Sequence, residues 1–344
     1  MKYTIFFRAD GNVKAGYGHV IRSLSLAAIL KKRYNCVFVI QNPDSFLKIQ
    51  IENICNQIIE IPVSENFLKE SKMLSKRVQS DDIVVLDGYN FNTDYQSQIK
   101  KKCFKLVCID DIFENHFVAD AIINHGEGIK KSNYSAEKYS QLFLGSSYSI
   151  LRKSFLRDHD FREIFAEQNR RNAYRIFINL GGTDQQNYTE KALKLCLKSH
   201  KVKTIDIVIG SFYLHGDRLA KIQKENSDVR IKIYSNISEQ MICNLMKKSS
   251  FGICSASTVS YEYVSSGGVL LLYQTVDNQK NIYDFMIKYG LGYPARSFMK
   301  ILSKVNLQKN RNDYFLNRKK YFPGNSDKNL MKIFDNFELE RVSV

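Results

Sequence analysis

Short apolar runs rich in β-branched and aromatic residues alternate with segments of helical periodicity along almost the whole chain. This alternation is typical of α/β proteins with parallel sheets, because parallel strands need a long crossover, usually a helix, between them. Strands are predicted in the first half at 3–8, 36–40, 58–61, 83–87, 106–109, 121–123 and 141–144. The second half predicts strands at 175–179, 204–209, 229–234, 251–255 and 269–272, with helices between them.

Residues 150–172 are charged and interrupt this alternation, which then restarts. A chain of 344 residues also fits two domains of ordinary size. We therefore predict a first Rossmann-like domain over 1–150, an interdomain connection over 151–172, and a second Rossmann-like domain over 173–344. The second ends in a helical tail, about 327–340, which could instead pack back across the first domain. Ligands of such sheets bind at the carboxyl ends of the strands, so a site is expected in a cleft between facing domains.

The chain carries a net charge of +16, which raises the question of nucleic-acid binding. The basic clusters at 31–33, 100–102, 170–171 and 318–320 are dispersed and are not interleaved with aromatic residues. We therefore expect a solvated basic surface and no nucleic-acid partner. Part of the positive field would attract an anionic nucleotide or an anionic membrane surface.

The start of the chain enters a predicted strand directly, without the regions of a signal peptide, and no apolar run is long enough to span a membrane. The seven cysteines include no C-x-x-C pair, which favours buried reduced thiols over a metal or redox site. We expect a cytoplasmic protein without stable membrane insertion.

The motif RADGNVKAGYGHVIRS, residues 8–23, joins the first strand to the first helix through a glycine-containing loop. Its glycines do not follow the G-x-G-x-x-G spacing of a dinucleotide site. Such a layout brings backbone N–H groups and a helix N-terminus close to a ligand. His19 falls in the first turn of the helix, where the helix dipole favours a neutral imidazole that can accept a proton. A capping or packing histidine is the alternative.

Acidic residues end two other predicted strands of the first half: Asp87, before Gly88 and Tyr89, and the pair Asp110 and Asp111. Either Asp87 or Asp110 could orient His19. The aspartate pair could also bind a metal with His116 or His125, but no spacing here is diagnostic of a metal site. We expect no metal and no cofactor.

Polar turns follow three strands of the second half. Glycines and helix-capping hydroxyl groups at such turns suit a nucleotide diphosphate, a carboxylate suits a ribose diol, and amides suit sugar hydroxyls. Structural turns and caps are the alternative for each. The candidates are Gly181, Gly182, Thr183 and Asp184; Ser255, Ser257 and Thr258 with Glu262; and Asn278 and Gln279.

These motifs, with the order RADGNVKAGYGHVIRS, LDGY, IDD, NLGGTD, SASTVSYE and DNQ over about residues 3–290, resemble one enzyme family. It is the UDP-2,4-diacetamido-2,4,6-trideoxy-β-L-altropyranose hydrolases of pseudaminic acid (nonulosonic acid) biosynthesis, which supplies bacterial surface glycans. The resemblance implies a GT-B fold, related to the glycosyltransferase that makes lipid II. It also implies metal-independent hydrolysis of a UDP-sugar by a histidine-activated water.

Carried onto this chain, the resemblance makes His19 the general base, with Tyr89 and Asp87 beside it. Some members have histidine where this chain has Gly88, so a role of that side chain does not transfer. The turn at residues 181–184 and the turn at residues 255–258, together with Glu262, resemble the part that holds UDP. The remaining substrate-binding candidates come from the opening motif and the aspartate pair: Arg8, Asp10, Gly16, Gly18, Arg22, Asp110 and Asp111.

The sequence thus predicts a hydrolase that releases UDP and a free sugar and works as a monomer. A GT-B glycosyltransferase with a UDP-sugar donor is the alternative, and a nucleotide-sugar-binding protein without catalytic activity is a third hypothesis. The exact sugar stereoisomer and the role of the chain after about residue 295 are left open.

Overall fold

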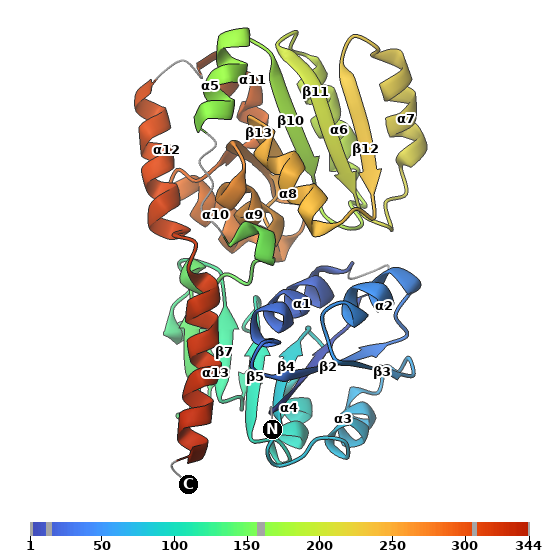
Figure 1. The fold of residues 1–344 in the computed structure, drawn as a ribbon, viewed down its shortest axis with the longest axis vertical. Helices are drawn as coiled ribbons and strands as arrows, with labels where there is room; N and C mark the ends of the chain where they lie inside the picture. The colour runs from blue at the N-terminus through green and yellow to red at the C-terminus, as the bar shows by residue number, and fades with distance from the viewer. Residues whose placement is uncertain (1–2, 12–15, 157–161, 305–307, 343–344) are drawn as a thin grey trace. The chain divides into compact units, whose positions relative to one another are not determined.

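The computed structural model describes residues 3–11, 16–156, 162–304 and 308–342. The chain divides into two compact units. Unit 1 comprises Met1–Lys153 with Asn325–Val344, and unit 2 comprises Ser154–Gly324. Each is described separately below (Figure 1).

Unit 1 is built on a parallel sheet whose described strands have the order β3-β2-β1-β4-β5-β7-β9. The short strands β6 and β8 form a separate two-stranded sheet. The bounds are β1 Thr4–Ala9, β2 Asn35–Gln41, β3 Gln57–Ile61, β4 Ile83–Asp87, β5 Lys105–Ile109, β6 His116–Phe117, β7 Ala121–Asn124, β8 Ser135–Ala136 and β9 Gln141–Leu144. The helices are α1 Gly18–Leu30, α2 Ser45–Glu52, α3 Phe67–Ser75, α4 Thr93–Lys100 and α13 Ser326–Val342.

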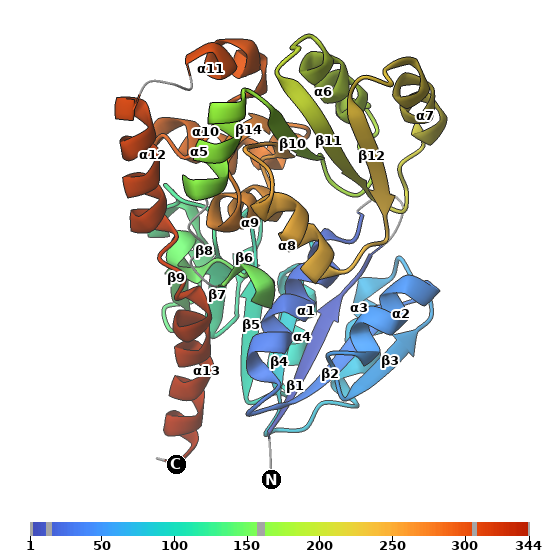
Figure 2. The same ribbon diagram turned by 45° about the horizontal axis from the view of Figure 1, so that its top comes forward.

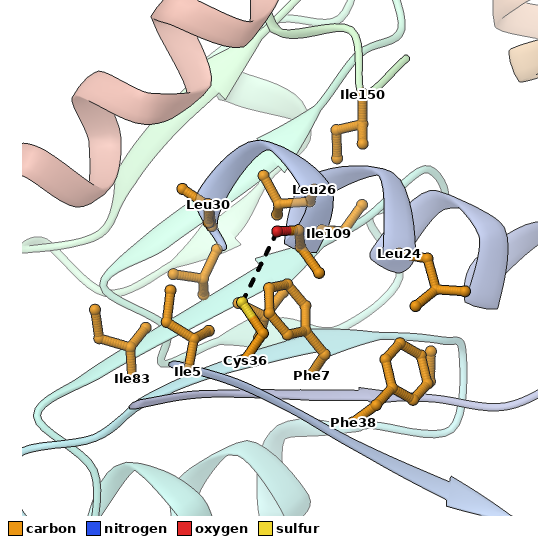
Figure 3. Packing of buried hydrophobic residues seen from close by; sticks show 14 of the residues in the cluster. Ile5, Phe7, Leu24, Leu26, Leu30, Cys36, Phe38, Ile83, Ile109 and Ile150 are labelled. Atoms are coloured by element: carbon orange, nitrogen blue, oxygen red, sulfur yellow. Dashed lines mark hydrogen bonds between the residues drawn. The ribbon is translucent and has the colours of Figure 1, made fainter. Parts of the chain in front are cut away.

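Both faces of this sheet are covered, and alternate residues of β1 show the division. Ile5 and Phe7 belong to a cluster with apolar residues of α1, α2 and α13, whereas Phe6 belongs to a second cluster with residues of α3 and α4. Figure 3 shows the first cluster, where Cys36 Sγ lies 3.8 Å from a backbone carbonyl oxygen of α1. Burial on both faces explains why these strands are almost continuously apolar in the sequence.

The C-terminal helix α13 packs on unit 1, although about 170 residues of unit 2 precede it in the chain. Leu330, Ile333, Phe334 and Phe337 are all buried in the cluster around α1. The domain bounds predicted from the sequence assigned this tail to the second domain, 173–344. The structure groups it with unit 1, because its apolar stripe completes a core that the first 153 residues leave open.

Unit 2 repeats the architecture with a parallel sheet of order β12-β11-β10-β13-β14-β15 among its described strands. Figure 2 shows β10, β11 and β12 side by side. The strands of this unit are β10 Tyr174–Asn179, β11 Val202–Ile209, β12 Arg230–Ser235, β13 Phe251–Ser255, β14 Val269–Tyr273 and β15 Tyr293–Pro294. Its helices are α5 Arg162–Arg171, α6 Tyr188–Leu197, α7 Gly216–Glu225, α8 Glu239–Lys247, α9 Thr258–Ser266, α10 Lys280–Lys288, α11 Phe298–Lys304 and α12 Gln308–Tyr321.

Every strand predicted from the sequence is present within two residues of its expected bounds, so two parallel α/β units are confirmed. The very short strands β6, β8 and β15 were not predicted. The segment predicted to connect the domains, 151–172, contains helix α5, and this helix belongs to unit 2. In the described parts of the chain, no helix combines the length and hydrophobicity of a membrane span.

Candidate active site

The strand order of unit 1 reverses direction between β1 and β4, which are hydrogen-bonded neighbours. In open α/β sheets, ligands bind outside the carboxyl ends of strands at such a reversal. Asp87 is the last residue of β4, and His19 lies in the first turn of α1, which follows β1. The topology therefore places both side chains where this class of fold binds ligands.

Asp87 is the centre of a buried polar cluster. Its Oδ1 lies 2.7 Å from Nδ1 of His19 and accepts a hydrogen bond of 2.6 Å from Nη2 of Arg22. Its Oδ2 accepts bonds of 2.9 Å from Nε of Arg22 and 3.2 Å from the hydroxyl of Ser23. Burial opposes ionisation of this carboxyl, but Arg22 and His19 together hold the pKa of Asp87 well below its usual range.

The ionised Asp87 determines which nitrogen of His19 carries the proton. A lone pair on Nδ1 would face an anionic oxygen 2.7 Å away, so Nδ1 carries the hydrogen and donates it to Asp87. The nearby Nη2 of Arg22, 3.2 Å from Nδ1, is then a close contact without a hydrogen bond. The lone pair of the neutral ring is consequently on Nε2, which can accept a proton from a ligand or water.

Arg22 is buried and pairs with two carboxylates. Besides its bonds to Asp87, its Nη1 donates to Oδ2 of Asp111 at 3.2 Å. Burial opposes its charge, but Asp87 and Asp111 raise the pKa of Arg22 above its ordinary value. Arg22, a substrate-binding candidate, thus positions Asp87 through its side chain.

The rings of Tyr89 and His19 are nearly perpendicular, at 88°, with 4.7 Å between their centroids. Tyr89 is 43% exposed, so part of the residue faces solvent. Gly88 precedes it, and a Cβ at this position would lie 3.0 Å from the Phe91 ring. A larger residue here would require Phe91 to move.

The pair Asp110 and Asp111 divides between two roles. Oδ2 of Asp110 accepts hydrogen bonds from the backbone N–H of Phe113 and the hydroxyl of Tyr134, both 2.9 Å, and burial raises the pKa of Asp110. Asp111 pairs with Arg22 and keeps one buried oxygen, Oδ1, without a hydrogen-bond partner. Asp87, not Asp110, orients His19.

The histidines proposed as alternative metal ligands lie in different surroundings. His125 is buried, and burial together with Arg22 lowers the pKa of His125 to about 4. His116 contacts Ser135 and Glu137 instead. Among the residues that the structure describes, no group of three or more histidine, cysteine and acidic side chains is arranged to bind a metal ion.

Arg8 and Asp10 form a second polar network at the end of β1. Arg8 is fully buried and donates to Glu70 on α3, at 2.8 and 3.0 Å, and to both carboxylate oxygens of Asp10. Asp10 also accepts from the backbone N–H of Gln41 at 2.9 Å. This network fixes the start of the loop that leads to His19.

The glycines of that loop that lie in the described residues are Gly16 and Gly18, whereas residues 12–15 of the motif lie outside them. Gly16 has a φ of +70°, a left-handed conformation that strains other residues. Gly18 is the first residue of α1, and an added Cβ would meet no atom within 4 Å. Gly18 is exposed, so its backbone is open to a ligand, whereas Gly16 is buried.

Unit 2 has the same reversal of strand order, here between β10 and β13. The turn after β10 contains Gly181, whose φ is +97°, followed by Gly182 and Thr183. An added Cβ at Gly181 would lie 4.0 Å from the hydroxyl of Ser255, so the turns after β10 and β13 adjoin. Both predicted turns thus meet at the carboxyl edge of two neighbouring strands.

Asp184 helps to cap helix α6, as one of the sequence alternatives proposed, although the N-cap residue itself is Asn187, whose side chain accepts from the backbone N–H of Glu190. The carboxylate of Asp184 accepts from the backbone N–H groups of Tyr188 at 2.9 Å and Thr189 at 2.7 Å. The N-terminus of α6 is therefore already satisfied by a carboxylate of the chain itself. An anion at this turn would have to use the N–H groups of the glycine turn.

The N-terminus of α9 differs, because Ser257 makes no side-chain capping bond to that helix. The hydroxyl groups of Ser255 and Ser257 lie 3.0 Å apart, next to Thr258 at the first position of α9. Glu262, one turn further on, is 2% exposed. This turn therefore combines hydroxyl groups with a helix N-terminus, an arrangement that suits an anion.

The third turn follows β14, the neighbour of β13. Gln279 uses its Oε1 to accept from the backbone N–H and the hydroxyl of Thr275, at 2.8 and 3.1 Å, and so fixes the turn itself. Asn278 precedes it in a 3₁₀ turn, Asp277–Gln279. The three predicted turns of unit 2 therefore follow three successive strands of its sheet.

Sequence reasoning missed several residues of these sites. Ser23 follows His19 by one helical turn, a spacing that would have indicated a shared face of α1. Glu70 carried no recognisable signal, because it lies on α3, far from Arg8 in the chain. Gly210 was also missed, although a Cβ there would lie 2.1 Å from the carbonyl oxygen of Gly182.

No protein-family model matches the chain. The chain is 29% identical over 314 residues to uncharacterized protein MJ1062 of Methanocaldococcus jannaschii, covering 89% of this chain and 60% of that relative. It therefore spans about 60% of the length of that relative. It is also 26% identical over 299 residues to the UDP-2,4-diacetamido-2,4,6-trideoxy-β-L-altropyranose hydrolase of Campylobacter jejuni, covering 83% of this chain and 97% of the hydrolase.

Among solved structures, MurG of Acinetobacter baumannii matches with a TM-score of 0.68 at 13% identity, covering 98% of this chain and 100% of MurG. HepE of Anabaena, solved in complex with UDP-glucose, matches with a TM-score of 0.60 at 10% identity, covering 97% and 99%. The fold is GT-B-like. At these identities the solved structures show the fold alone, whereas the hydrolase match extends the sequence resemblance over most of the chain.

Proposed function

We propose that the protein is an enzyme that hydrolyses a UDP-sugar, releasing UDP and the free sugar. The observation that carries this proposal is the Asp87–His19 pair at the strand reversal of unit 1, in which the contact of Nδ1 with Asp87 leaves Nε2 of His19 as the nitrogen that can accept a proton. The similarity to the Campylobacter hydrolase supports UDP-2,4-diacetamido-2,4,6-trideoxy-β-L-altropyranose as the substrate, in pseudaminic acid biosynthesis.

In this proposal Nε2 of His19 removes a proton from a water molecule as that water attacks the anomeric carbon. Asp87 holds the ring in the required tautomer and stabilises the imidazolium that forms. Arg22 keeps Asp87 ionised and fixed, and Tyr89 offers its ring and hydroxyl group beside the imidazole. A positioned base contributes about 10²–10⁴ in rate.

The turns of unit 2 are proposed to bind the UDP moiety. Backbone N–H groups at Gly181, Gly182 and Thr183, with the N-terminus of α9, would stabilise the negative charge that develops on the diphosphate. Glu262 and Asn278 are the candidates for the ribose and the sugar. UDP is a good leaving group, so the proposed reaction needs no metal or cofactor. We further propose that the enzyme acts as a cytoplasmic monomer.

The first test is release of UDP from UDP-2,4-diacetamido-2,4,6-trideoxy-β-L-altropyranose without any acceptor, for the wild type and for His19→Ala. We expect release by the wild type and a loss of about a hundredfold or more in the variant. UDP binding, measured by calorimetry, should be unchanged in His19→Ala, because the proposed UDP-binding residues belong to unit 2.

Other outcomes would decide between the remaining readings. Slow release that an added sugar acceptor accelerates, with transfer to that acceptor, would establish the glycosyltransferase alternative. Binding of the UDP-sugar without turnover, with or without an acceptor, would leave a nucleotide-sugar-binding protein and overturn the hydrolase.

A further inference from the structure

A groove of about 690 Å³ opens in unit 1 beside Tyr89. Its polar lining comes from the segments before α3 and α4 and from the residues after β4: Glu65, Asn66, Tyr89, Asn90, Asn92 and Asp94. Two apolar side chains of the first turn of α3 complete it. Of the described residues, neither His19 nor Asp87 lines the groove, so it adjoins the reacting groups and does not contain them.

Helices α3 and α4 both begin at this groove, and their capping residues shape its chemistry. Asn66 Oδ1 accepts from the backbone N–H of Lys69 at 2.9 Å, and Asn92 Oδ1 accepts from that of Tyr95 at 3.0 Å. Each amide oxygen is therefore engaged with its own helix. The Nδ2 groups remain as hydrogen-bond donors at the groove.

The charge of the groove argues against a phosphate. Among the described residues, its lining includes two carboxylates, Glu65 and Asp94, and no lysine or arginine, although the chain as a whole carries +16. Carboxylates repel an anion but accept hydrogen bonds from hydroxyl groups. The exposed aromatic ring of Tyr89 adds an apolar surface that suits the C–H face of a ring. Acceptors, amide donors and one aromatic face together fit a neutral, hydroxyl-bearing ring.

We propose that this groove is a saccharide-binding subsite that holds a neutral sugar ring against Tyr89, next to the Asp87–His19 pair. The inference rests on the proposed function for the link to His19, whose ring lies nearly perpendicular to that of Tyr89. The sugar has two possible sources: the sugar of the UDP-sugar itself, retained as product, or a separate acceptor saccharide. The recognition chemistry is the same for both.

The test is saturation-transfer NMR on the full chain with free 2,4-diacetamido-2,4,6-trideoxy-L-altrose and N-acetylglucosamine as probes, and with UDP as a separate probe. The variants are Asp94→Asn and Asn90→Ala. Asp217→Asn is the matched control, because Asp217 is likewise an exposed acid in the first turn of a helix, α7 in unit 2. It loses the same charge at the same kind of position.

We expect saturation transfer to at least one sugar in the wild type. Its affinity should fall about tenfold in Asp94→Asn and Asn90→Ala, because each loses a hydrogen bond to the ligand. Asp217→Asn should bind the sugar like the wild type, and all variants should bind UDP alike. Absence of transfer to either sugar, or equal affinity in Asp94→Asn and Asp217→Asn, would overturn the subsite.

Competition with the UDP-sugar identifies the source of the ligand. If the free sugar competes with the UDP-sugar in turnover, the groove holds the sugar of the substrate; if both bind together, it holds a second saccharide. Both results uphold the subsite. Sugar binding that is sensitive to Asp94→Asn in a protein that releases no UDP would uphold the subsite while overturning the hydrolase. UDP release by a protein whose sugar binding is insensitive to Asp94→Asn would uphold the hydrolase and overturn the subsite.

Discussion

Nδ1 of His19 lies 2.7 Å from Oδ1 of Asp87, a residue 68 positions further along the chain. Arg22, one turn further along the helix that carries His19, donates hydrogen bonds to the same carboxylate through Nε and Nη2. The ring is thus held from one side by a residue whose charge is fixed by its neighbours. Both the tautomer and the direction of Nε2 follow from this arrangement.

Asp87→Asn should reduce UDP release about a hundredfold or more while UDP affinity stays the same. The amide can donate to Nδ1, which favours the tautomer whose Nε2 is protonated and cannot act as a base. Steady-state release assays and UDP calorimetry check this. Ser23→Ala, which removes only the 3.2 Å bond to Asp87, should cost less than about tenfold. Equal losses in both variants would mean that Asp87 acts through stability alone.

Stability should depend on pH through His125. Burial and Arg22 lower the pKa of His125 to about 4 in the folded state, whereas an unfolded histidine titrates near 6.5. Between these values the unfolded chain binds a proton that the folded chain does not. The free energy of unfolding therefore keeps this contribution, about 3 kcal/mol, above pH 6.5 and loses it as the pH falls toward 4.

His125→Asn isolates this effect. The difference in the free energy of unfolding between wild type and variant should shrink by about 2 kcal/mol when urea denaturation is followed at pH 5 instead of pH 7. The window lies above the range in which most carboxylates titrate. Parallel pH dependences of the two proteins between pH 5 and pH 7 would contradict the prediction.

Much of the fold could be predicted because two buried parallel sheets leave a strong periodic signal. The strands ending at Asp87 and Ser255 were predicted with their observed bounds, since each is an apolar run that stops at a polar turn. Strand β15 has only two residues and no such run. The return of α13 to unit 1 depends on which core has room for its apolar stripe, and that is a property of the assembled fold.

The candidate site could be predicted only in part for a similar reason. His19 and Asp87 carry local signals, a helix start and a strand end. The role of Arg22 does not, because the same arginine could as well face a phosphate. Only its burial between Asp87 and Asp111 distinguishes a positioning residue from a ligand contact.

Glu70→Gln should destabilise the protein by about 3 kcal/mol, because it leaves the buried Arg8 with one charged partner fewer. Asp335→Asn provides the contrast. It breaks the exposed pair with Arg33, whose side chain is 56% exposed, and should cost at most about 1 kcal/mol. Urea denaturation followed by circular dichroism measures both. A loss in Glu70→Gln no larger than that in Asp335→Asn would show that Asp10 alone satisfies Arg8.

Phe337→Ala should lower the free energy of unfolding by about 3–5 kcal/mol, although Phe337 lies only seven residues from the end of the chain. Its side chain is 2% exposed and packs against Phe334, with 5.9 Å between ring centroids. Leu339→Ala, on the same helix but 66% exposed, should change stability by no more than about 0.5 kcal/mol. The two variants differ in burial and share a helix, so a similar effect of both would mean that helix propensity, and not packing on the core of unit 1, accounts for the contribution of α13.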